Sequence, residues 1–108
     1  MANFFNSFIM VRNKSSNLIL VHVEYTFSRE RIFENKFVPA GFTGCFGFPI
    51  PARDIRLLVV NPKNANRFIV RRFRGRSRIQ KCYDTTNSNL LKRSACGNRG
   101  CSINGNYV

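Results

Sequence analysis

The sequence predicts a small all-β protein with a single domain, folded as an antiparallel β-sandwich or an open barrel. Apolar and polar residues alternate through most of the chain, which is the pattern of half-buried strands. Segments of this kind recur about every 8–12 residues between Pro, Gly and Asn, as they do in sandwiches and barrels. A length of 108 residues allows one domain, and a hydrophobic content of 44% supplies its core.

The first part of the chain predicts three strands. A short strand is expected at 8–12. The segment 18–27 is a longer strand, because its odd positions are apolar and therefore share one face. A polar turn at 28–31 leads into another strand at 32–38, so these two strands are predicted to form a β-hairpin.

The middle of the chain continues the pattern after a break at 39–41. The segment 42–50 alternates again, but Pro49 and Pro51 cannot donate to a hydrogen-bond ladder. This segment is therefore predicted to be an edge strand or an extended arm. The remaining predicted elements are a strand at 54–60, a turn at 61–66, and strands at 67–73 and 78–83 on either side of Gly75.

The last part of the chain differs in composition from the rest. No segment before residue 84 has the 3.6-residue period of a helix. Residues 85–108 are rich in Asn, Gly and Ser and have few apolar residues to bury. We therefore expect a sandwich domain over 1–84 and an irregular, basic tail over 85–108 that packs on it or trails from it.

Positive charge is concentrated in the second half of the chain. The formal net charge is +13, with 18 Lys and Arg against 5 Asp and Glu. Residues 1–54 carry six cations and four acids, whereas residues 55–108 carry twelve cations and one acid, Asp84. Repulsion among so many like charges destabilises a compact chain unless an anion offsets it. The charge pattern thus indicates an anionic partner.

An Arg-rich segment at 67–81 is the leading candidate site, read as a strand, a turn and a strand. Guanidinium groups bind phosphate through paired hydrogen bonds, and aromatic rings stack on unpaired bases, so the segment predicts binding of RNA or single-stranded DNA. The alternative is a solvated edge strand whose charge prevents aggregation. The candidate residues are Arg67, Arg71, Arg72, Phe73, Arg74, Arg76, Arg78 and Lys81, with possible tail contacts from Lys92, Arg93 and Arg99.

Two further functions stay open. Phe42, Phe46 and Phe48, together with basic side chains, could seat a toxin-like β-sandwich on an anionic membrane surface. A self-assembling structural protein, active as a homo-oligomer, is the third possibility. No apolar run approaches the roughly 20 residues that cross a bilayer.

Catalysis has little support in the sequence. His22 is the sole histidine, and no motif ties it to a Ser or Cys nucleophile. Phosphate-binding loops, dinucleotide fingerprints and metalloprotease motifs are also lacking from the sequence. We therefore expect a non-enzymatic binding protein without cofactor, bound metal or small-molecule substrate.

The four cysteines leave three states open. Four reduced thiols are favoured, and the alternatives are a zinc site or a disulfide between Cys96 and Cys101, whose intervening Gly97 and Gly100 let a short loop close. The N-terminal apolar run precedes the first cation, Arg12, which is unlike a secretory signal. An intracellular location is therefore favoured.

Overall fold

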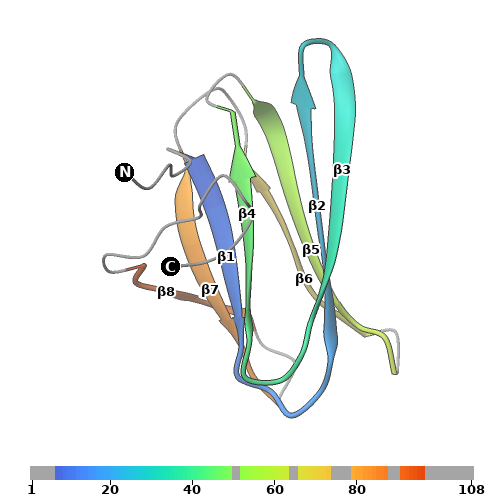
Figure 1. Cartoon of the computed structure of the whole chain (residues 1–108), viewed down its shortest axis with the longest axis vertical. Coiled ribbons are helices and arrows are strands. Elements are labelled where there is room, and N and C mark those ends of the chain that lie inside the picture. Colours follow the sequence, from blue (N-terminus) through green and yellow to red (C-terminus); the bar gives the residue numbers. More distant parts are fainter. Residues whose placement is uncertain (1–6, 50–51, 64–65, 74–78, 88–90, 97–108) are drawn as a thin grey trace.

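The chain forms two β-sheets that pack against each other on a shared core (Figure 1). The computed structural model describes residues 7–49, 52–63, 66–73, 79–87 and 91–96, with the backbone alone for 66–73. The strands are β1 (Ser7–Asn13), β2 (Ile19–Phe27), β3 (Glu30–Val38), β4 (Thr43–Phe48), β5 (Arg53–Asn61), β6 (Asn66–Phe73), β7 (Gln80–Thr85) and β8 (Leu91–Ser94). The all-β prediction is confirmed.

The strand order is β4-β1-β7-β8 in one sheet and β3-β2-β5-β6 in the other. Both sheets are antiparallel except at β1 and β7, which run parallel with Met10 opposite Cys82. The expectation of a wholly antiparallel fold is therefore wrong at this pair. Parallel neighbours need a long connection rather than a tight turn, and about seventy residues separate these two strands.

Period-two alternation places the core between the sheets. In β2, Ile19, Val21 and Val23 are fully buried, and the residues between them are half-buried. Ile9 and Val11 of β1 enter the same cluster from the other sheet. Burial of these aliphatic side chains from both sheets is the main force that holds the sandwich together.

The predicted hairpin is confirmed in β2 and β3, which pair from Ile19↔Val38 to Phe27↔Glu30. Its turn is Ser28-Arg29, and both residues have positive φ, 53° and 67°. A two-residue turn that matches the twist of the strands requires this backbone, for which Asn-Gly is the usual sequence. The hairpin therefore forms despite its turn residues, because the strand pairing outweighs the local preference.

The two edge strands that follow one another in the chain, β3 and β4, are linked across the sheets by Lys36. Its Nζ donates to the carbonyl oxygen of Cys45 at 2.6 Å and lies 5.0 Å from the centre of the Phe46 ring. The prediction that 42–50 contains an edge strand is confirmed by the place of β4 at the end of its sheet. A cation on an edge strand also discourages pairing with a second chain.

Asn13 joins three elements at the end of β1. Its Nδ2 donates to the carbonyls of Asn17 and Val38 at 2.7 and 2.8 Å. Its Oδ1 accepts hydrogen bonds from the Ser15 hydroxyl at 2.6 Å and from the Thr85 hydroxyl at 3.0 Å. The side chain is fully buried, so these bonds replace the water that it loses and fix the turn between β1 and β2.

The tail differs from the prediction in its first part. The predicted domain ends at residue 84, but β7 continues to Thr85 and residues 91–94 form β8, which pairs with β7. Leu91 is buried in the shared core, which explains why this polar segment forms a strand. Residues 97–108 lie outside the described part of the chain.

The predicted state of the cysteines is wrong. Cys82 and Cys96 form a disulfide with their Cα atoms 5.4 Å apart, and Cys45 is disulfide-bonded as well. The favoured prediction of four reduced thiols is therefore wrong, and so are both alternatives, a four-thiolate zinc site and a Cys96–Cys101 disulfide. The reason is the pairing of β8 with β7, which sets Ser94 opposite Cys82 and brings Cys96 within reach of it.

Candidate nucleic-acid interface

The Arg-rich segment spans two sheets rather than one hairpin. Arg67, Arg71, Arg72 and Phe73 lie on β6, an edge strand of one sheet, and Lys81 lies on β7, an inner strand of the other. The expectation of a simple strand-turn-strand unit is therefore corrected, because β6 and β7 belong to different sheets. Arg74, Arg76 and Arg78 lie outside the described residues.

The register of β6 is set by its antiparallel pairing with β5. Arg72 stands opposite Arg56, and Arg71 opposite Leu57. The register shifts between Val59 and Val60, so Val60 pairs with Arg67. Three arginines of the segment thus have defined backbone positions along the edge of sheet β3-β2-β5-β6.

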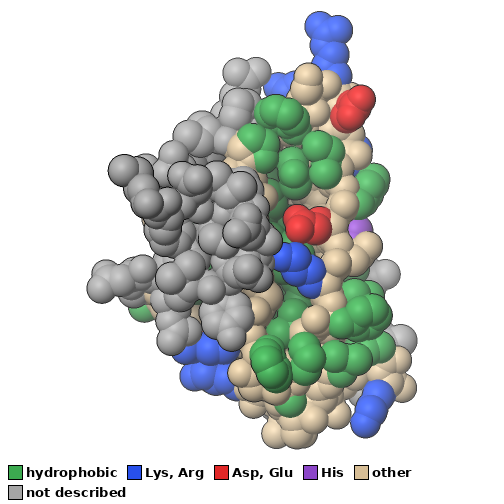
Figure 2. Space-filling model, viewed as in Figure 1, with side chains coloured by type: hydrophobic (Ala, Val, Ile, Leu, Met, Phe, Trp, Pro, Cys, Tyr) green, Lys and Arg blue, Asp and Glu red, His purple; other side chains and the backbone are tan. Residues whose placement is uncertain are grey.

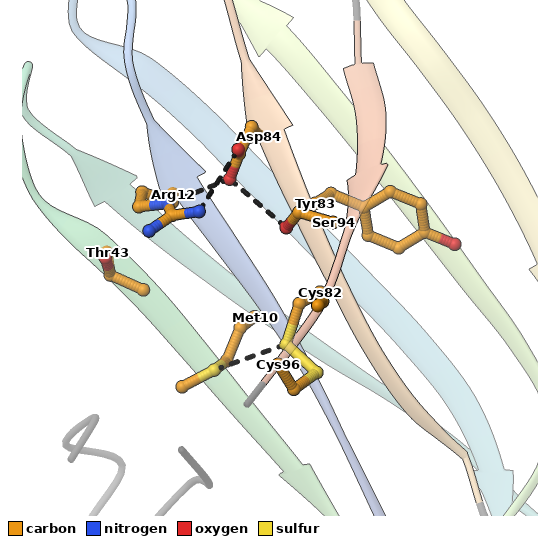
Figure 3. A pocket seen from close by; sticks show the side chains of 9 residues that line it. Met10, Arg12, Thr43, Cys82, Tyr83, Asp84, Ser94 and Cys96 are labelled. Atoms are coloured by element: carbon orange, nitrogen blue, oxygen red, sulfur yellow. Dashed lines mark hydrogen bonds and ion pairs between the residues drawn. A yellow bond between two sulfur atoms is a disulfide. The ribbon is translucent and has the colours of Figure 1, made fainter. Parts of the chain in front are cut away.

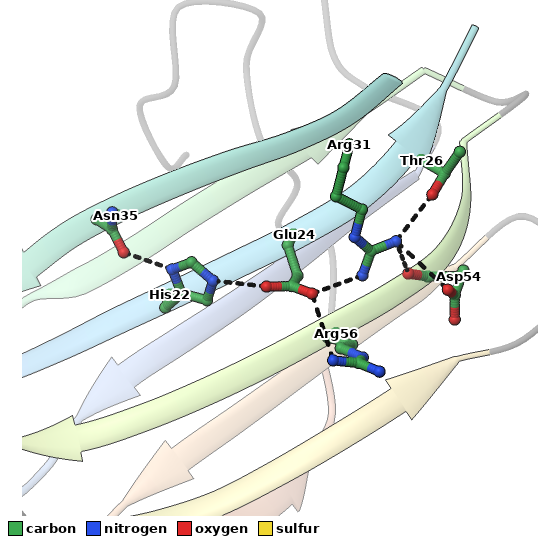
Figure 4. A network of polar contacts seen from close by, with 7 residues as sticks. All are labelled: His22, Glu24, Thr26, Arg31, Asn35, Asp54 and Arg56. Carbon is green, nitrogen blue, oxygen red and sulfur yellow. Dashed lines mark hydrogen bonds and ion pairs between the residues drawn. The ribbon is translucent and has the colours of Figure 1, made fainter. Parts of the chain in front are cut away.

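The outer face of the same sheet carries a polar network centred on Glu24 (Figure 4). Arg31 donates to Glu24 Oε1 at 2.8 Å, Arg56 lies 3.5 Å from the same oxygen, and His22 Nε2 lies 3.0 Å from Oε2. Hydrogen bonds from His22 and Arg31 hold the pKa of the Glu24 carboxyl below its usual value, although burial opposes the shift. This acid is therefore fully engaged by neighbours on its own sheet.

Asp84 is the centre of a second network on the other sheet (Figure 3). Arg12 donates to both of its carboxylate oxygens at 2.9 and 3.2 Å, and Lys14 Nζ lies 3.2 Å away. Burial raises the pKa of Asp84, but hydrogen bonds from Arg12 and Lys14 outweigh burial and leave that pKa below its usual value. The sole acid in the basic half of the sequence is thus paired with cations from the N-terminal half.

A pocket of about 200 Å³ lies beside this ion pair and the disulfide (Figure 3). Arg12, Thr43 and Ser94 give it a polar side, and Met10 and the Cys82–Cys96 disulfide give it an apolar side. The Tyr83 ring points away from it and belongs to the core. Because the Arg12 guanidinium already binds Asp84 through two hydrogen bonds, the pocket has little positive charge to offer an anion.

The remaining predicted contacts have mixed outcomes. Lys92 and Arg93 lie exposed on β8, and Arg99 is outside the described residues. Phe42 is exposed in the turn before β4, but Phe46 and Phe48 are fully buried in the core. Two of the three predicted membrane contacts are therefore wrong, because even positions in this segment face the opposite sheet.

The sequence analysis missed two exposed aromatic residues, Phe33 and Phe37 on β3. They are 59% and 63% exposed. Apolar side chains are accordingly visible at the surface in the region of β3 and β4 (Figure 2). The signal was present in the sequence, because Phe33 and Phe37 share a face of an alternating segment, but only the strand order shows that this face points outward.

No helix within the described ranges has the length and hydrophobicity to cross a membrane. Within those ranges there is also no group of three or more His, Cys, Asp or Glu side chains arranged to hold a metal ion. In comparisons with known proteins, the chain matches no family model and no curated sequence.

Proposed function

We propose that this protein binds single-stranded nucleic acid without catalysing a reaction, through the Arg-rich segment 67–81. The observation that carries the proposal is the charge balance. Lys and Arg outnumber Asp and Glu by thirteen, 18 against 5, in a chain of 108 residues. Most of the positive charge therefore has no acidic counterpart within the molecule, whatever its detailed geometry.

The described ion pairs support the location. Glu24, Glu34, Asp54 and Asp84 are paired with Arg12, Lys14, Arg31, Lys36 and Arg56. Four of the five acids in the sequence are thus already engaged by cations of other segments. The segment itself supplies seven cations within fifteen residues, and it includes the edge strand β6. A polyanion that follows this edge would meet a row of phosphate-binding groups.

The test is the salt dependence of binding to a labelled oligothymidine of about 16 nucleotides, measured by fluorescence anisotropy. Six phosphate contacts predict a log–log slope of about −4 for a single strand. Replacement of Arg72→Gln and Arg74→Gln together is expected to make the slope shallower by about 1.4, because two phosphate contacts are lost.

Arg29→Gln is the matched control, because it removes one cation from the turn between β2 and β3, at the far edge of the sheet from β6. Its slope is expected to equal that of the wild type. An unchanged slope in the Arg72→Gln, Arg74→Gln variant would show that the segment is not the contact surface. Failure of the wild-type protein to bind at low salt would refute nucleic-acid binding itself.

Two further measurements on the same purified protein test the two other hypotheses. Co-sedimentation with anionic but not neutral liposomes, lost on Phe42→Ala, would instead favour a membrane-surface protein. Light scattering that rises with protein concentration in the absence of any added anion would favour self-assembly. For the membrane hypothesis Phe42 is the one predicted aromatic contact that stays accessible.

A further inference from the structure

Phe33 and Phe37 lie on the outer face of sheet β3-β2-β5-β6, four residues apart on one strand. Both rings are more than half exposed, at 59% and 63%. Strand geometry separates their Cα atoms by about 13 Å and keeps them on the same side of the sheet. Two large rings in this position expose apolar area that a soluble domain gains nothing by leaving uncovered.

Each ring begins a row of residues that crosses the whole sheet. Phe33 is opposite Glu24, Glu24 is opposite Arg56, and Arg56 is opposite Arg72. The second row runs in the same way from Phe37 through Leu20 and Val60 to Arg67. Both rows therefore join an exposed ring on one edge strand to an arginine position on the other, across about 14 Å.

The acids between these edges, Glu24 and Asp54, are both paired with cations of the same sheet. Glu24 is held by Arg31, Arg56 and His22, as described above. His22 also packs beside the Phe33 ring, with centroids 5.8 Å apart, and this limits how that ring can turn. The middle of the sheet is thus neutralised, and one of its rings is positioned in advance.

We infer that this outer face is a stacking platform for unpaired bases, on which Phe33 and Phe37 each stack on one base while the phosphates follow the arginine-bearing edge at β6. The inference rests on the proposed function and adds to it that the protein recognises the unpaired bases of the ligand. An aromatic ring stacks on a base of any sequence, and in a duplex the base faces are already stacked on one another. The platform therefore selects single strands and has little preference for sequence.

The test uses the same oligothymidine and a strand of equal length that lacks bases. Phe33→Leu and Phe37→Leu keep an apolar side chain but remove the π-face. Each is expected to weaken oligothymidine binding at least about fivefold, and the two together at least about 25-fold. The salt slope should not change, because no phosphate contact is lost. Phe33→Tyr is expected to keep wild-type affinity.

The base-free strand separates stacking from other effects. The base-free strand should bind the wild-type protein as weakly as oligothymidine binds the double Leu variant. The Leu substitutions should not lower the affinity for the base-free strand. Phe42→Leu is the matched control, because this ring is 55% exposed but lies in the turn before β4, off this sheet face. It is expected to leave binding within about twofold.

Two outcomes would overturn the inference, and they can be told apart. If the wild-type protein binds oligothymidine with a steep salt slope but the Leu variants bind equally well, the platform is wrong and the proposed function stands. If the wild-type protein does not bind oligothymidine at low salt, both fail. Unchanged thermal unfolding of the variants shows that they are folded and that their affinities can be compared.

Discussion

The two sheets share one core but differ on their outer faces. On sheet β4-β1-β7-β8, Phe8, Met10, Cys45 and Cys82 form a second buried apolar cluster, and Cys96 packs against it. On sheet β3-β2-β5-β6, the outer face instead exposes Phe33 and Phe37 around a network of charged groups. One outer face therefore carries buried apolar residues, and the other leaves two large rings exposed.

The contrast teaches that alternation of apolar and polar residues does not by itself show which face of a strand is buried. β1 is buried at nearly every position, so both of its faces contribute to stability. On β3, Val38 is buried in the core and Ile32 packs against it, whereas Phe33 and Phe37 are exposed and contribute little to stability. The packing of the core does not account for these exposed rings, and the proposed stacking platform gives them a role.

The largest expected effect compares two phenylalanines from the two outer faces. Phe8 is 5% exposed and Phe33 is 59% exposed. Phe8→Ala is expected to lower the free energy of unfolding by about 3–5 kcal/mol, because it leaves a cavity. Phe33→Ala is expected to change it by about 0.5 kcal/mol or less, because the ring has little packing to lose. Urea denaturation measures both, and equal costs would break the comparison.

A smaller effect is expected from the disulfide on the buried face. Removal of Cys82 and Cys96 together, as the double Ala variant, should cost about 3 kcal/mol, because the bridge closes a loop across a sequence separation of 14. Two results together would contradict a stabilising disulfide. They are a wild-type melting temperature that a reductant does not change, and a double Ala variant as stable as the wild type. Nucleic-acid affinity should be unaffected, since the disulfide lies on the other sheet.

The smallest effect concerns pH, and here the two faces are expected to behave alike. The pKa values of Glu24 and Asp84 are both lowered in the folded protein, so each carboxylate stabilises the fold at neutral pH. That contribution is complete above the unfolded pKa values, about 4, and is lost as pH falls below them. Between neutral and acidic pH, the free energy of unfolding of Glu24→Gln and of Asp84→Asn should therefore each fall by about 1 kcal/mol less than that of the wild type.

Denaturation at a series of pH values checks this prediction. Glu30→Gln is the control, because Glu30 is exposed at the start of β3, so its substitution should leave the curve unchanged. If Glu24→Gln and Asp84→Asn lose as much free energy of unfolding at acidic pH as the wild type does, the ion pairs do not stabilise the fold.

Most of the fold could be predicted from local pattern. Period-two alternation identified the strands before residue 84 and the hairpin of β2 and β3, because a strand that is buried on one face must alternate. β8 was missed, since Leu91 gives too short an apolar signal to reveal a strand. The parallel pairing of β1 with β7 was missed because it joins residues that are distant in the sequence. The Cys82–Cys96 bridge was missed because it depends on the pairing of β7 with β8.

The sequence by itself determined that the chain is an all-β domain with a strong excess of positive charge in its second half, because composition and period are local properties. The tertiary structure alone decided which faces are covered. Strand order placed Phe46 in the core and Phe33 outside, and it set Arg72 in line with Arg56 and Phe33 across one sheet. These relations depend on which strands become neighbours, and that is settled by the packing of the whole chain.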